Sequence, residues 1–461
     1  MDQILQYIRG HRRQHLAQLF DLLRIPSVST LPERAEDVKR CAQFLADDLQ
    51  AMGMRNVNVM STNGHPAVYA EWLEAPDAPT ILIYGHYDVQ PPDPLDLWES
   101  PPFDPQIRDG EIYARGSADD KGQAFAYFKA IEAYLSKKGS LPVNVKLLIE
   151  GEEEIGSAHT HKFVYDHLTL LQADAILLSD NSMFARGIPA ICCGTRGLVA
   201  CQIELESAAR DLHSGAFGGV AENPIQVLAD ILSALKDDDE RITIPGFYDD
   251  VLELSAEERQ YFAGLPFDGE ALQQEIGVRG FVGEKGFTPV EREWARPALD
   301  INGILGGFTG PGAKTIIPAK AMAKITMRLV SKQNPDKILQ AAKDYISSLA
   351  PESVKLSFSG DAGGTAYLTP LDHPVLKHVA KAVRQSYGRE PLFTRTGGSI
   401  GILSTFSDAL RIPIAMVGLS YPDDNIHAPN EHLAEEAYYS GIETAARLFN
   451  ELKNWDPGAA S

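Results

Sequence analysis

Residues 143–154 read VNVKLLIEGEEE, a run in which an apolar segment leads directly into a dense group of glutamates. The apolar, β-branched segment 143–149 is typical of a buried strand. Four carboxylates crowded at the end of such a strand repel one another. That cost is tolerated on a solvated surface, or where a cation neutralises the charges. Taken alone, the stretch is therefore compatible both with an acidic loop and with a metal site.

Other apolar runs along the chain also end next to side chains that can bind metal. The runs are 80–84, 173–178 and 412–417, and the side chains that follow them are His86, Asp180 and His427. Asp119 stands between a short strand and the start of a helix. In open α/β sheets, ligands bind outside the carboxyl ends of the strands. A single histidine at a strand end is usually structural, but metal-type side chains at several strand ends together predict a metal site.

The side chains that could bind metal limit which metal ions the site would prefer. They include two histidines and several carboxylates but no cysteine, which suits zinc, or manganese or cobalt, in an oxygen-rich site. The carboxylates are too many for one tetrahedral ion, whereas two ions bridged by one carboxylate would use them and could clamp a hydrolytic water. Asp88, two residues after His86, can hold the far nitrogen of that imidazole. A spare glutamate beside the ligands is then available as general base.

Length and composition limit the class of protein. The chain has 461 residues, which favours two domains, and a net charge of -21, which argues against nucleic acid or an anionic membrane as partner. Four cysteines without a CxxC pair favour a reducing, cytoplasmic setting. Residues 2–24 are spaced as one amphipathic helix and lack the apolar core of a signal peptide. No run is long enough to span a membrane, so we expect a cytoplasmic protein.

The hydrophobic pattern changes along the chain and later changes back. Residues 1–196 and 370–461 alternate buried strands with helices. This predicts an α/β catalytic domain with a mixed, mostly parallel sheet and helices on both faces. Residues 197–369 contain half-exposed strands at 198–206, 321–330 and 355–359, with helical patterns at 223–236 and 335–349 between them. This order is typical of a two-layer α+β domain. We therefore expect the first domain to be interrupted by the second, which itself carries a charged insertion at about 237–296.

Eight motifs resemble those of a family of di-zinc metallopeptidases that includes carnosine dipeptidase, aminoacylase and glutamate carboxypeptidase. They are GHYDVQPP (85–92), ARGSADDKGQ (114–123), EGEEEIGS (150–157), LSDN (178–181), RDLHSGAFGG (210–219), GAKTIIPAKAMAKITMRLV (312–330), TRTGGSIGI (394–402) and NIHAPNE (425–431). They follow one another in order over almost the whole chain, which makes the resemblance specific. It is closest to the cytosolic non-specific dipeptidase branch.

The resemblance implies two Zn²⁺ ions per subunit, with Mn²⁺ or Co²⁺ as alternatives. One ion is expected to bind His86, Asp119 and Asp180. The other is expected to bind Asp119, Glu154 and His427, so that Asp119 bridges the two ions.

The resemblance also implies roles beside the metals. Glu153 is expected to be the general base, and Asp88 to orient the first histidine ligand. The peptide bond between Asp119 and Asp120 is expected to be cis, as it often is in the family. In the family, aminopeptidases and dipeptidases have an aspartate at the position of Asp180, whereas carboxypeptidases and aminoacylases have a glutamate. Asp180 therefore favours a dipeptidase.

The second domain resembles the family's lid, which also forms the homodimer. His213 matches a histidine that reaches the partner's active site and steadies the tetrahedral oxyanion, although a histidine in a Gly-rich turn would otherwise count as structural. Arg328 matches a clamp for the substrate carboxylate, a task that suits the fork of a guanidinium. Thr315, Gly398 and Ser399 match further substrate contacts.

These expectations combine into a cytoplasmic di-metal dipeptidase that hydrolyses dipeptides by a metal-bridging hydroxide, with Glu153 as the base. One alternative is an amidohydrolase on the same scaffold that acts on N-acyl amino acids, such as a deacylase or desuccinylase. Another is a binding protein that has lost catalysis, which is disfavoured because every ligand position and the base are filled. A serine or cysteine hydrolase is disfavoured because neither a GxSxG elbow nor a Cys/His constellation stands out.

Overall fold

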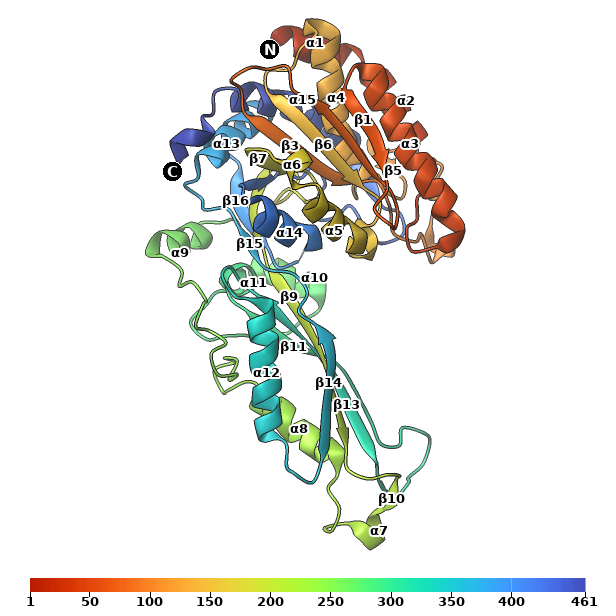
Figure 1. The fold of residues 1–461 in the computed structure, drawn as a ribbon, viewed down its shortest axis with the longest axis vertical. Helices are drawn as coiled ribbons and strands as arrows, with labels where there is room; N and C mark the ends of the chain where they lie inside the picture. Colours follow the sequence, from red (N-terminus) through yellow and green to blue (C-terminus); the bar gives the residue numbers. More distant parts are fainter. Residues whose placement is uncertain (399, 461) are drawn as a thin grey trace. The chain divides into compact units, whose positions relative to one another are not determined.

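The computed structural model describes residues 1–398 and 400–460, and the chain divides into two compact units (Figure 1). Unit 1 comprises Met1–Cys193, Thr369–Thr394 and Gly401–Ser461, and unit 2 comprises Gly194–Leu368 and Arg395–Ile400. Residues 395–400, which the sequence analysis places in the catalytic domain, therefore belong to unit 2.

A nine-stranded sheet has the order β1-β2-β6-β3-β7-β17-β8-β15, in which β16 also pairs with β8, and most of its strands belong to unit 1. Its four central strands are parallel: β6 (Asn144–Glu150), β3 (Thr80–His86), β7 (Ala175–Leu178) and β17 (Ile414–Met416). The remaining strands are β1 (Arg55–Met60), β2 (Ala67–Trp72), β8 (Ala190–Thr195), β15 (Tyr367–Leu368) and β16 (Leu392–Thr396). Because the central strands are parallel, their carboxyl ends lie at one edge of the sheet.

Helices cover both faces of this sheet, as the sequence predicts (Figure 1). They are α1 (Asp2–Gly10), α2 (Arg12–Leu23), α3 (Ala35–Met52), α4 (Lys121–Lys138), α5 (Ala158–Asp166), α6 (Leu168–Leu171), α13 (Pro374–Tyr387), α14 (Gly401–Leu410) and α15 (Glu435–Leu452). Strand β3 shows why both faces are needed, because successive side chains point to opposite sides. Ile81 and Ile83 join the main core, while the ring of Tyr84 packs edge-on against Phe406 of α14 with centroids 5.2 Å apart. The α/β class is thus confirmed.

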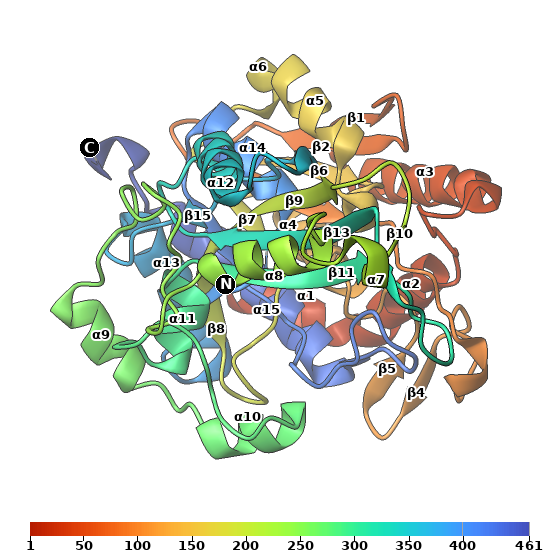
Figure 2. The ribbon, with the colours of Figure 1, turned by 90° about the horizontal axis from the view of Figure 1, so that it is seen from below.

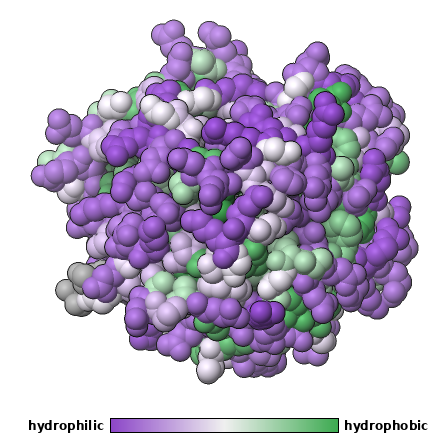
Figure 3. Space-filling model, turned by 90° about the horizontal axis from the view of Figure 1, so that it is seen from above, coloured by the Kyte–Doolittle hydropathy of each residue, from purple (hydrophilic) through white to green (hydrophobic). Residues whose placement is uncertain are grey.

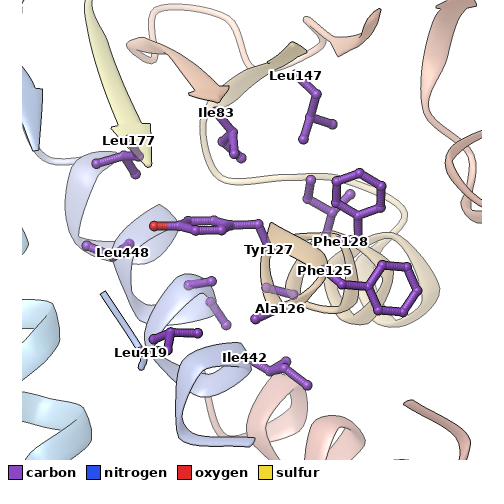
Figure 4. Close-up of a cluster of buried hydrophobic side chains, with 14 of the residues drawn as sticks. Ile83, Phe125, Ala126, Tyr127, Phe128, Leu147, Leu177, Leu419, Ile442 and Leu448 are labelled. Carbon is purple, nitrogen blue, oxygen red and sulfur yellow. The ribbon is translucent and has the colours of Figure 1, made fainter. Parts of the chain in front are cut away.

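Helix α4 lies at the centre of the main core, and its residues from Lys121 to Tyr134 are all buried. Figure 4 shows Tyr127 between side chains of the sheet, including Ile83 and Leu177, and side chains of α15, including Leu448. Burying one large apolar side chain contributes roughly 1.5–3 kcal/mol. This packing fixes the amino-terminal end of α4, which directly follows Asp119 and Asp120.

The first helical stretch differs from the expectation of one helix over 2–24. The chain forms α1 and α2, separated at His11, whose φ and ψ are -109° and 9°. The imidazole Nδ1 of His11 lies 2.8 Å from the carbonyl oxygen of Tyr7, and the two rings stack at 3.8 Å. This local contact competes with regular helix at that residue. The apolar spacing continues through the break, which is why periodicity did not reveal it.

Unit 2 contains a four-stranded antiparallel sheet with the order β11-β13-β9-β14. The strands are β9 (Gly197–Glu206), β11 (Ala298–Gly306), β13 (Lys320–Leu329) and β14 (Lys355–Asp361). Helices α8 (Pro224–Ala234) and α12 (Pro335–Leu349) share one hydrophobic cluster with alternate residues of β9 and β13. Figure 2 shows α8 lying across β11 and β13. One sheet face is therefore covered by helices, which gives two layers.

The expected insertion at about 237–296 carries three short helices, α9 (Ala256–Ala263), α10 (Gly269–Ile276) and α11 (Pro289–Ala295). Ser255 and Thr288 precede α9 and α11 and form capping boxes. In each box the hydroxyl accepts a hydrogen bond from the backbone N–H of a glutamate three residues on, and the carboxylate of that glutamate accepts one from the backbone N–H of the Ser or Thr. Such caps stabilise helices too short to persist alone. Two small elements complete unit 2, the strand pair β10 (Leu212–His213) and β12 (Ile316–Ile317), and helix α7 (Ser214–Phe217).

Hydrophilic side chains cover most of the face seen in Figure 3, with apolar residues in small groups between them. The four cysteines are buried thiols that form no disulfide. None of the helices in residues 1–398 and 400–460 combines the length and the apolar composition that crossing a membrane requires.

Candidate metal centre

The five predicted ligands come from different segments that meet at the carboxyl edge of the parallel strands. His86 is the last residue of β3, Asp180 follows β7, and Asp119 immediately precedes Asp120 and α4. Glu154 lies in the 3-10 turn Glu153–Ile155 after β6, and His427 lies between β17 and β18 (His432–Ala434). The peptide bond between Asp119 and Asp120 is cis, as expected.

The structure brings the five side chains into two groups that share Asp119. Oδ1 of Asp119 lies 3.0 Å from Nε2 of His86, and its Oδ2 lies 2.8 Å from Nε2 of His427. Oδ2 of Asp180 lies 4.0 Å from the same atom of His86, and Oε2 of Glu154 lies 3.2 Å from that of His427. Within each group, one atom per residue lies within 4.8 Å of the others. Asp119 thus turns one oxygen towards each group.

These distances fit ligands that surround an ion. Two donors about 2.1 Å from one tetrahedral ion lie roughly 3.4 Å apart. The donor set of each group, one imidazole and two carboxylates, is also one that binds zinc or manganese. The residues present therefore form a possible binding site for a pair of divalent ions.

Asp88 holds parts of both groups in place. Nδ1 of His86 lies 3.1 Å from the backbone oxygen of Asp88 and 3.4 Å from its Oδ1. The two carboxylate oxygens of Asp88 accept hydrogen bonds from the backbone N–H groups of Glu153 and Glu154, each at 3.2 Å. Asp88 and His86 are fully buried. One buried carboxylate thus orients the histidine and the turn that carries both glutamates.

Negative charge is crowded at this site. Burial and the nearby carboxylates of Asp180 and Glu154 raise the pKa of Glu153 to about 9. Burial and the carboxylate of Asp119 raise the pKa of Asp180 to about 7. Hydrogen bonds to Asp119 and Glu154 raise the pKa of His427 to about 10. The two carboxyl shifts arise because like charges share a poorly solvated space, and the His427 shift arises from the carboxylates beside it. Divalent cations relieve such repulsion between carboxylates.

The glutamates of the 150–154 stretch do not all face the centre. Glu150 is fully buried and accepts hydrogen bonds from three hydroxyls, those of Tyr84 at 2.6 Å, Thr160 at 2.7 Å and Ser157 at 3.0 Å. Glu152 is also buried, and its carboxylate accepts from the backbone N–H of His65 at 2.9 Å. These two carboxylates are satisfied by protein donors, whereas Glu153 and Glu154 face the possible metal groups.

Sequence reasoning missed two residues that support the centre. Nε2 of Gln90 donates to Oε2 of Glu154 at 2.7 Å. The fully buried Glu431 accepts from Nη1 of Arg115 at 2.6 Å and from the backbone N–H groups of Gly116, Ala118 and Asp119 at 2.9–3.1 Å. Both lie inside motifs quoted above, GHYDVQPP and NIHAPNE, so the motifs were the available signal. Their roles needed the fold, because their partners are distant in sequence.

Two of the residues expected to contact substrate lie beside each other in unit 2. His213 in β10 pairs with Ile316 in β12, and the backbone N–H of Ser214 donates to the oxygen of Thr315 at 3.1 Å. The side chain of His213 is exposed, and its Nδ1 accepts from the N–H of Gly215 at 2.9 Å. This leaves Nε2 of His213 to carry the ring proton and donate outwards.

The other expected substrate residues are linked through Arg196, also in unit 2. Arg328 in β13 lies opposite Leu198 of β9, and its charge, together with burial, lowers the pKa of Arg196. The backbone N–H of Arg196 donates to the oxygen of Gly398 at 3.2 Å, and its Nε donates to the oxygen of Gly397 at 3.1 Å. Ser399 lies outside the described residues.

The chain was compared with families of known proteins. Residues 82–451 match the model described as peptidase family M20/M25/M40. Beta-Ala-His dipeptidase of Homo sapiens is 30% identical over 469 residues, which cover 98% of this chain and 92% of that protein. Cys-Gly metallodipeptidase DUG1 of Candida albicans is 32% identical over 450 residues, which cover 93% of this chain and 92% of that protein.

Solved structures agree with this result. The crystal structure of human carnosine dipeptidase 1 has a TM-score of 0.79 and 30% identity, covering 98% of this chain and 99% of that one. The M20 family metallo-carboxypeptidase Sso-CP2 from Sulfolobus solfataricus has a TM-score of 0.84 and 32% identity, covering 96% of this chain and 99% of that one.

Proposed function

Because the chain belongs to peptidase family M20/M25/M40, we propose that it is a metallopeptidase that hydrolyses dipeptides. The observation that carries the proposal is the pair of ligand groups that share Asp119, with Glu153 beside them. Relatives named Beta-Ala-His dipeptidase and Cys-Gly metallodipeptidase cover nearly the whole chain, which supports dipeptides as the substrate class.

We propose two Zn²⁺ ions as the resident metals, with Mn²⁺ or Co²⁺ as substitutes. His86, Asp119 and Asp180 would hold one ion, and Asp119, Glu154 and His427 the other. When bound, such a pair polarises a peptide carbonyl and activates a water molecule. The ions would also neutralise the carboxylates that crowd this edge of the sheet.

The proton transfers are assigned to Glu153. Its carboxylate would take a proton from the attacking water and return it to the leaving amine, as a general base and then a general acid. The group would hold the proton between the two steps. Asp88 keeps the backbone N–H groups of Glu153 and Glu154 in place, which fixes the carboxylate relative to the ligands.

Substrate contacts are assigned to residues of unit 2. Arg328 would bind the carboxylate of the dipeptide, and Thr315, Gly398 and Ser399 would contribute further contacts. His213 would donate from Nε2 to the developing oxyanion, which is supported by its exposed ring and by the N–H donated to its Nδ1. We further propose a homodimer formed through unit 2, in which His213 serves the partner's site, and a cytoplasmic location.

The test is hydrolysis by purified protein reconstituted with Zn²⁺, Mn²⁺ or Co²⁺. Free dipeptides should be cleaved in a chelator-sensitive manner, and N-acyl amino acids at least about tenfold more slowly. Preferred cleavage of N-acyl amino acids would instead establish the deacylase alternative. Preferred cleavage of N-blocked dipeptides would indicate a carboxypeptidase, a second candidate favoured by the solved relative of that name. If the protein binds metal but hydrolyses none of these substrates, the alternative of a binding protein without catalysis would hold.

A further inference from the structure

A second cluster of metal-type side chains lies in unit 1, and the proposed mechanism does not use it. Glu111 in β5 (Glu111–Tyr113), Asp424 in the loop after β17, and His432 in β18 each offer one ligand atom within 4.8 Å of the others. Backbone contacts hold the three segments together. Strands β5 and β18 pair antiparallel, and the N–H of His432 donates to the backbone oxygen of Asp424 at 3.0 Å. The cluster is therefore anchored on regular structure.

Each carboxylate of the cluster is oriented through one oxygen and leaves the other without a donor. Oε1 of Glu111 accepts from Nη1 of Arg186 at 2.8 Å, and Oδ2 of Asp424 accepts from the backbone N–H of Tyr421 at 2.7 Å. Oε2 of Glu111 and Oδ1 of Asp424 are buried and have no hydrogen-bond partner in the described part of the chain. Asp424 is fully buried, and a buried acceptor that is left unpaired destabilises the folded chain, more so if it is charged.

The histidine is oriented in the same way. Nδ1 of His432 lies 2.9 Å from the backbone oxygen of Asn430, so Nδ1 carries the proton and Nε2 keeps its lone pair. The ring also stacks on Tyr113 with centroids 4.9 Å apart. Nε2 lies 3.9 Å from Oδ1 of Asp424, which is too far for a hydrogen bond but within the spacing of two ligands on one ion. Metal-bound histidines are commonly fixed through their other nitrogen in this manner.

Among the residues that the structure describes, the ion pairs at the cluster come from one arginine. Arg186 forms ion pairs here, with Nη2 3.8 Å from Oδ1 of Asp424 and Nε 3.0 Å from Oδ2 of the exposed Asp423. Arg108 of β4 (Gln106–Arg108) lies opposite Glu111 and stacks on Tyr113. The single positive charge of Arg186 is thus shared by the carboxylates of Glu111, Asp423 and Asp424.

We propose that Glu111, Asp424 and His432 bind a further divalent cation of the zinc or manganese type, with water completing its coordination. Two carboxylate oxygens and an imidazole nitrogen form a donor set suited to such ions. The ion would pin both ends of the 424–432 loop, which carries His427 at a φ of 62°. It would therefore stabilise the position of one ligand of the proposed catalytic pair. Binding at this cluster does not depend on the proposed peptidase activity.

The test is metal stoichiometry by mass spectrometry after saturation with Zn²⁺ alone and removal of free metal by gel filtration. We expect about three ions per chain for the wild type and about two for Glu111→Gln, which removes one ligand charge while keeping the shape. Asp423→Asn is the matched control, because Asp423 pairs with Arg186 but is not in the cluster. It should retain the wild-type stoichiometry.

A wild type that saturates at two ions would overturn the proposal regardless of how the variants fold. Equal stoichiometry in wild type and folded Glu111→Gln would overturn it as well, since the third ion would then lie elsewhere. His432→Gln provides a second variant if Glu111→Gln does not fold. Loss of a Co²⁺ absorption component in His432→Gln but not in Asp423→Asn would support direct ligation by the imidazole.

Discussion

Glu153 and Glu154 are neighbours in the sequence, yet their surroundings separate their tasks. Oε2 of Glu154 lies 3.2 Å from Nε2 of His427 and accepts a hydrogen bond from Gln90. Its geometry is that of a ligand held in place. Glu153 belongs to neither ligand group, so its carboxylate is available to take and return a proton.

We therefore expect Glu153→Gln to keep the bound metal ions and to lose most of its turnover. General-base catalysis typically contributes about 10²–10⁴-fold, so kcat should fall by that order while KM changes little. The measurement is steady-state kinetics on a dipeptide combined with metal analysis of the same preparation. Loss of an ion would make Glu153 a ligand, and near-normal turnover at full metal would remove it from the mechanism.

The shared carboxylate of Asp119 leads to a prediction about metal content. Asp119→Ala should release or scramble both ions of the proposed pair, because each group loses a ligand. Asp180→Ala is the matched comparison, since Asp180 belongs to one group only and should affect one ion. Metal analysis after dialysis distinguishes the two patterns. If Asp119→Ala loses a single ion while the other keeps its affinity, the bridging role is wrong.

At the scale of structural elements, one buried glutamate holds the backbone of the loop before α4 in place. Glu431 pairs with Arg115, which is 1% exposed, and accepts the backbone N–H groups that lead to Asp119. Glu431→Gln leaves the guanidinium buried without its counter-charge, so we expect a loss of about 3–5 kcal/mol in the free energy of unfolding. Urea denaturation measures it.

The control for that experiment is Glu436→Gln, because Glu436 forms an exposed pair with Arg12 at 3.3 Å. A surface pair of this kind contributes about 0–1 kcal/mol. Equal effects of the two substitutions would show that Glu431 does not hold the loop.

The contacts of α4 with the N-terminal helices predict a pH dependence. Glu132 accepts from the hydroxyl of Tyr7 and from Nζ of Lys129, at 3.0 and 2.9 Å. Burial would raise the pKa of Glu132, but His15 and Lys129 outweigh burial and lower it from 4.5 to about 2. A pKa lower in the folded than in the unfolded chain stabilises the folded state above about pH 4.5, and this contribution is lost as the pH falls towards 2.

We expect the difference in unfolding free energy between wild type and Glu132→Gln to be constant near pH 7 and to shrink between pH 4.5 and 2. Urea denaturation at pH 7, 4 and 3, with chelator in every sample, measures this difference free of metal effects. Glu36→Gln, which breaks an exposed pair with Lys39, should change stability by less than about 1 kcal/mol at each pH. A difference for Glu132→Gln that stays constant down to pH 3 would contradict the prediction.

Elements with a strong periodic pattern could be read from the sequence. The run 143–149 corresponds to β6, and the helix expected over 335–349 has those bounds in α12. Strand β11 was missed because its burial does not alternate and it contains two glycines, so its pairing with β13 defines it. The distinct roles of Glu150 and Glu152 could not be read either, because their hydroxyl and backbone partners meet them only in the folded chain.

At the scale of the whole molecule, the hydrophobic pattern predicted the α/β class and the eight motifs indicated the family. The similarity to known proteins confirms both. The segment 395–400 shows a limit of such reading. Residues 395 and 396 end strand β16, which begins in unit 1. Gly397 and Gly398 accept hydrogen bonds from Arg196 of unit 2, and no local sequence pattern encodes these contacts. The proposed roles of Arg328, Gly398 and His213 remain predictions, since they concern a bound substrate.

The proposed dimer leads to the last prediction, which concerns His213. If His213 of one chain serves the site that contains Glu153 of the other, then Glu153→Ala and His213→Ala homodimers should each be nearly inactive. In a mixed dimer of the two, one site combines both defects and the other keeps both native groups. A closed two-fold dimer allows this exchange, and random mixing should restore roughly a quarter of the wild-type activity, because half of the dimers have one of two sites intact.

The experiment mixes the two purified variants, allows subunit exchange, confirms mixed dimers by native mass spectrometry and then measures dipeptide hydrolysis. Mixing each variant with itself is the control, and it should leave activity unchanged. The restored activity should rise with the fraction of mixed dimers, because only the mixed dimer contains a site with both groups. Confirmed mixed dimers without recovered activity would mean that His213 acts on its own chain or not at all. A protein that stays monomeric under assay conditions yet hydrolyses dipeptides would contradict action across the dimer directly.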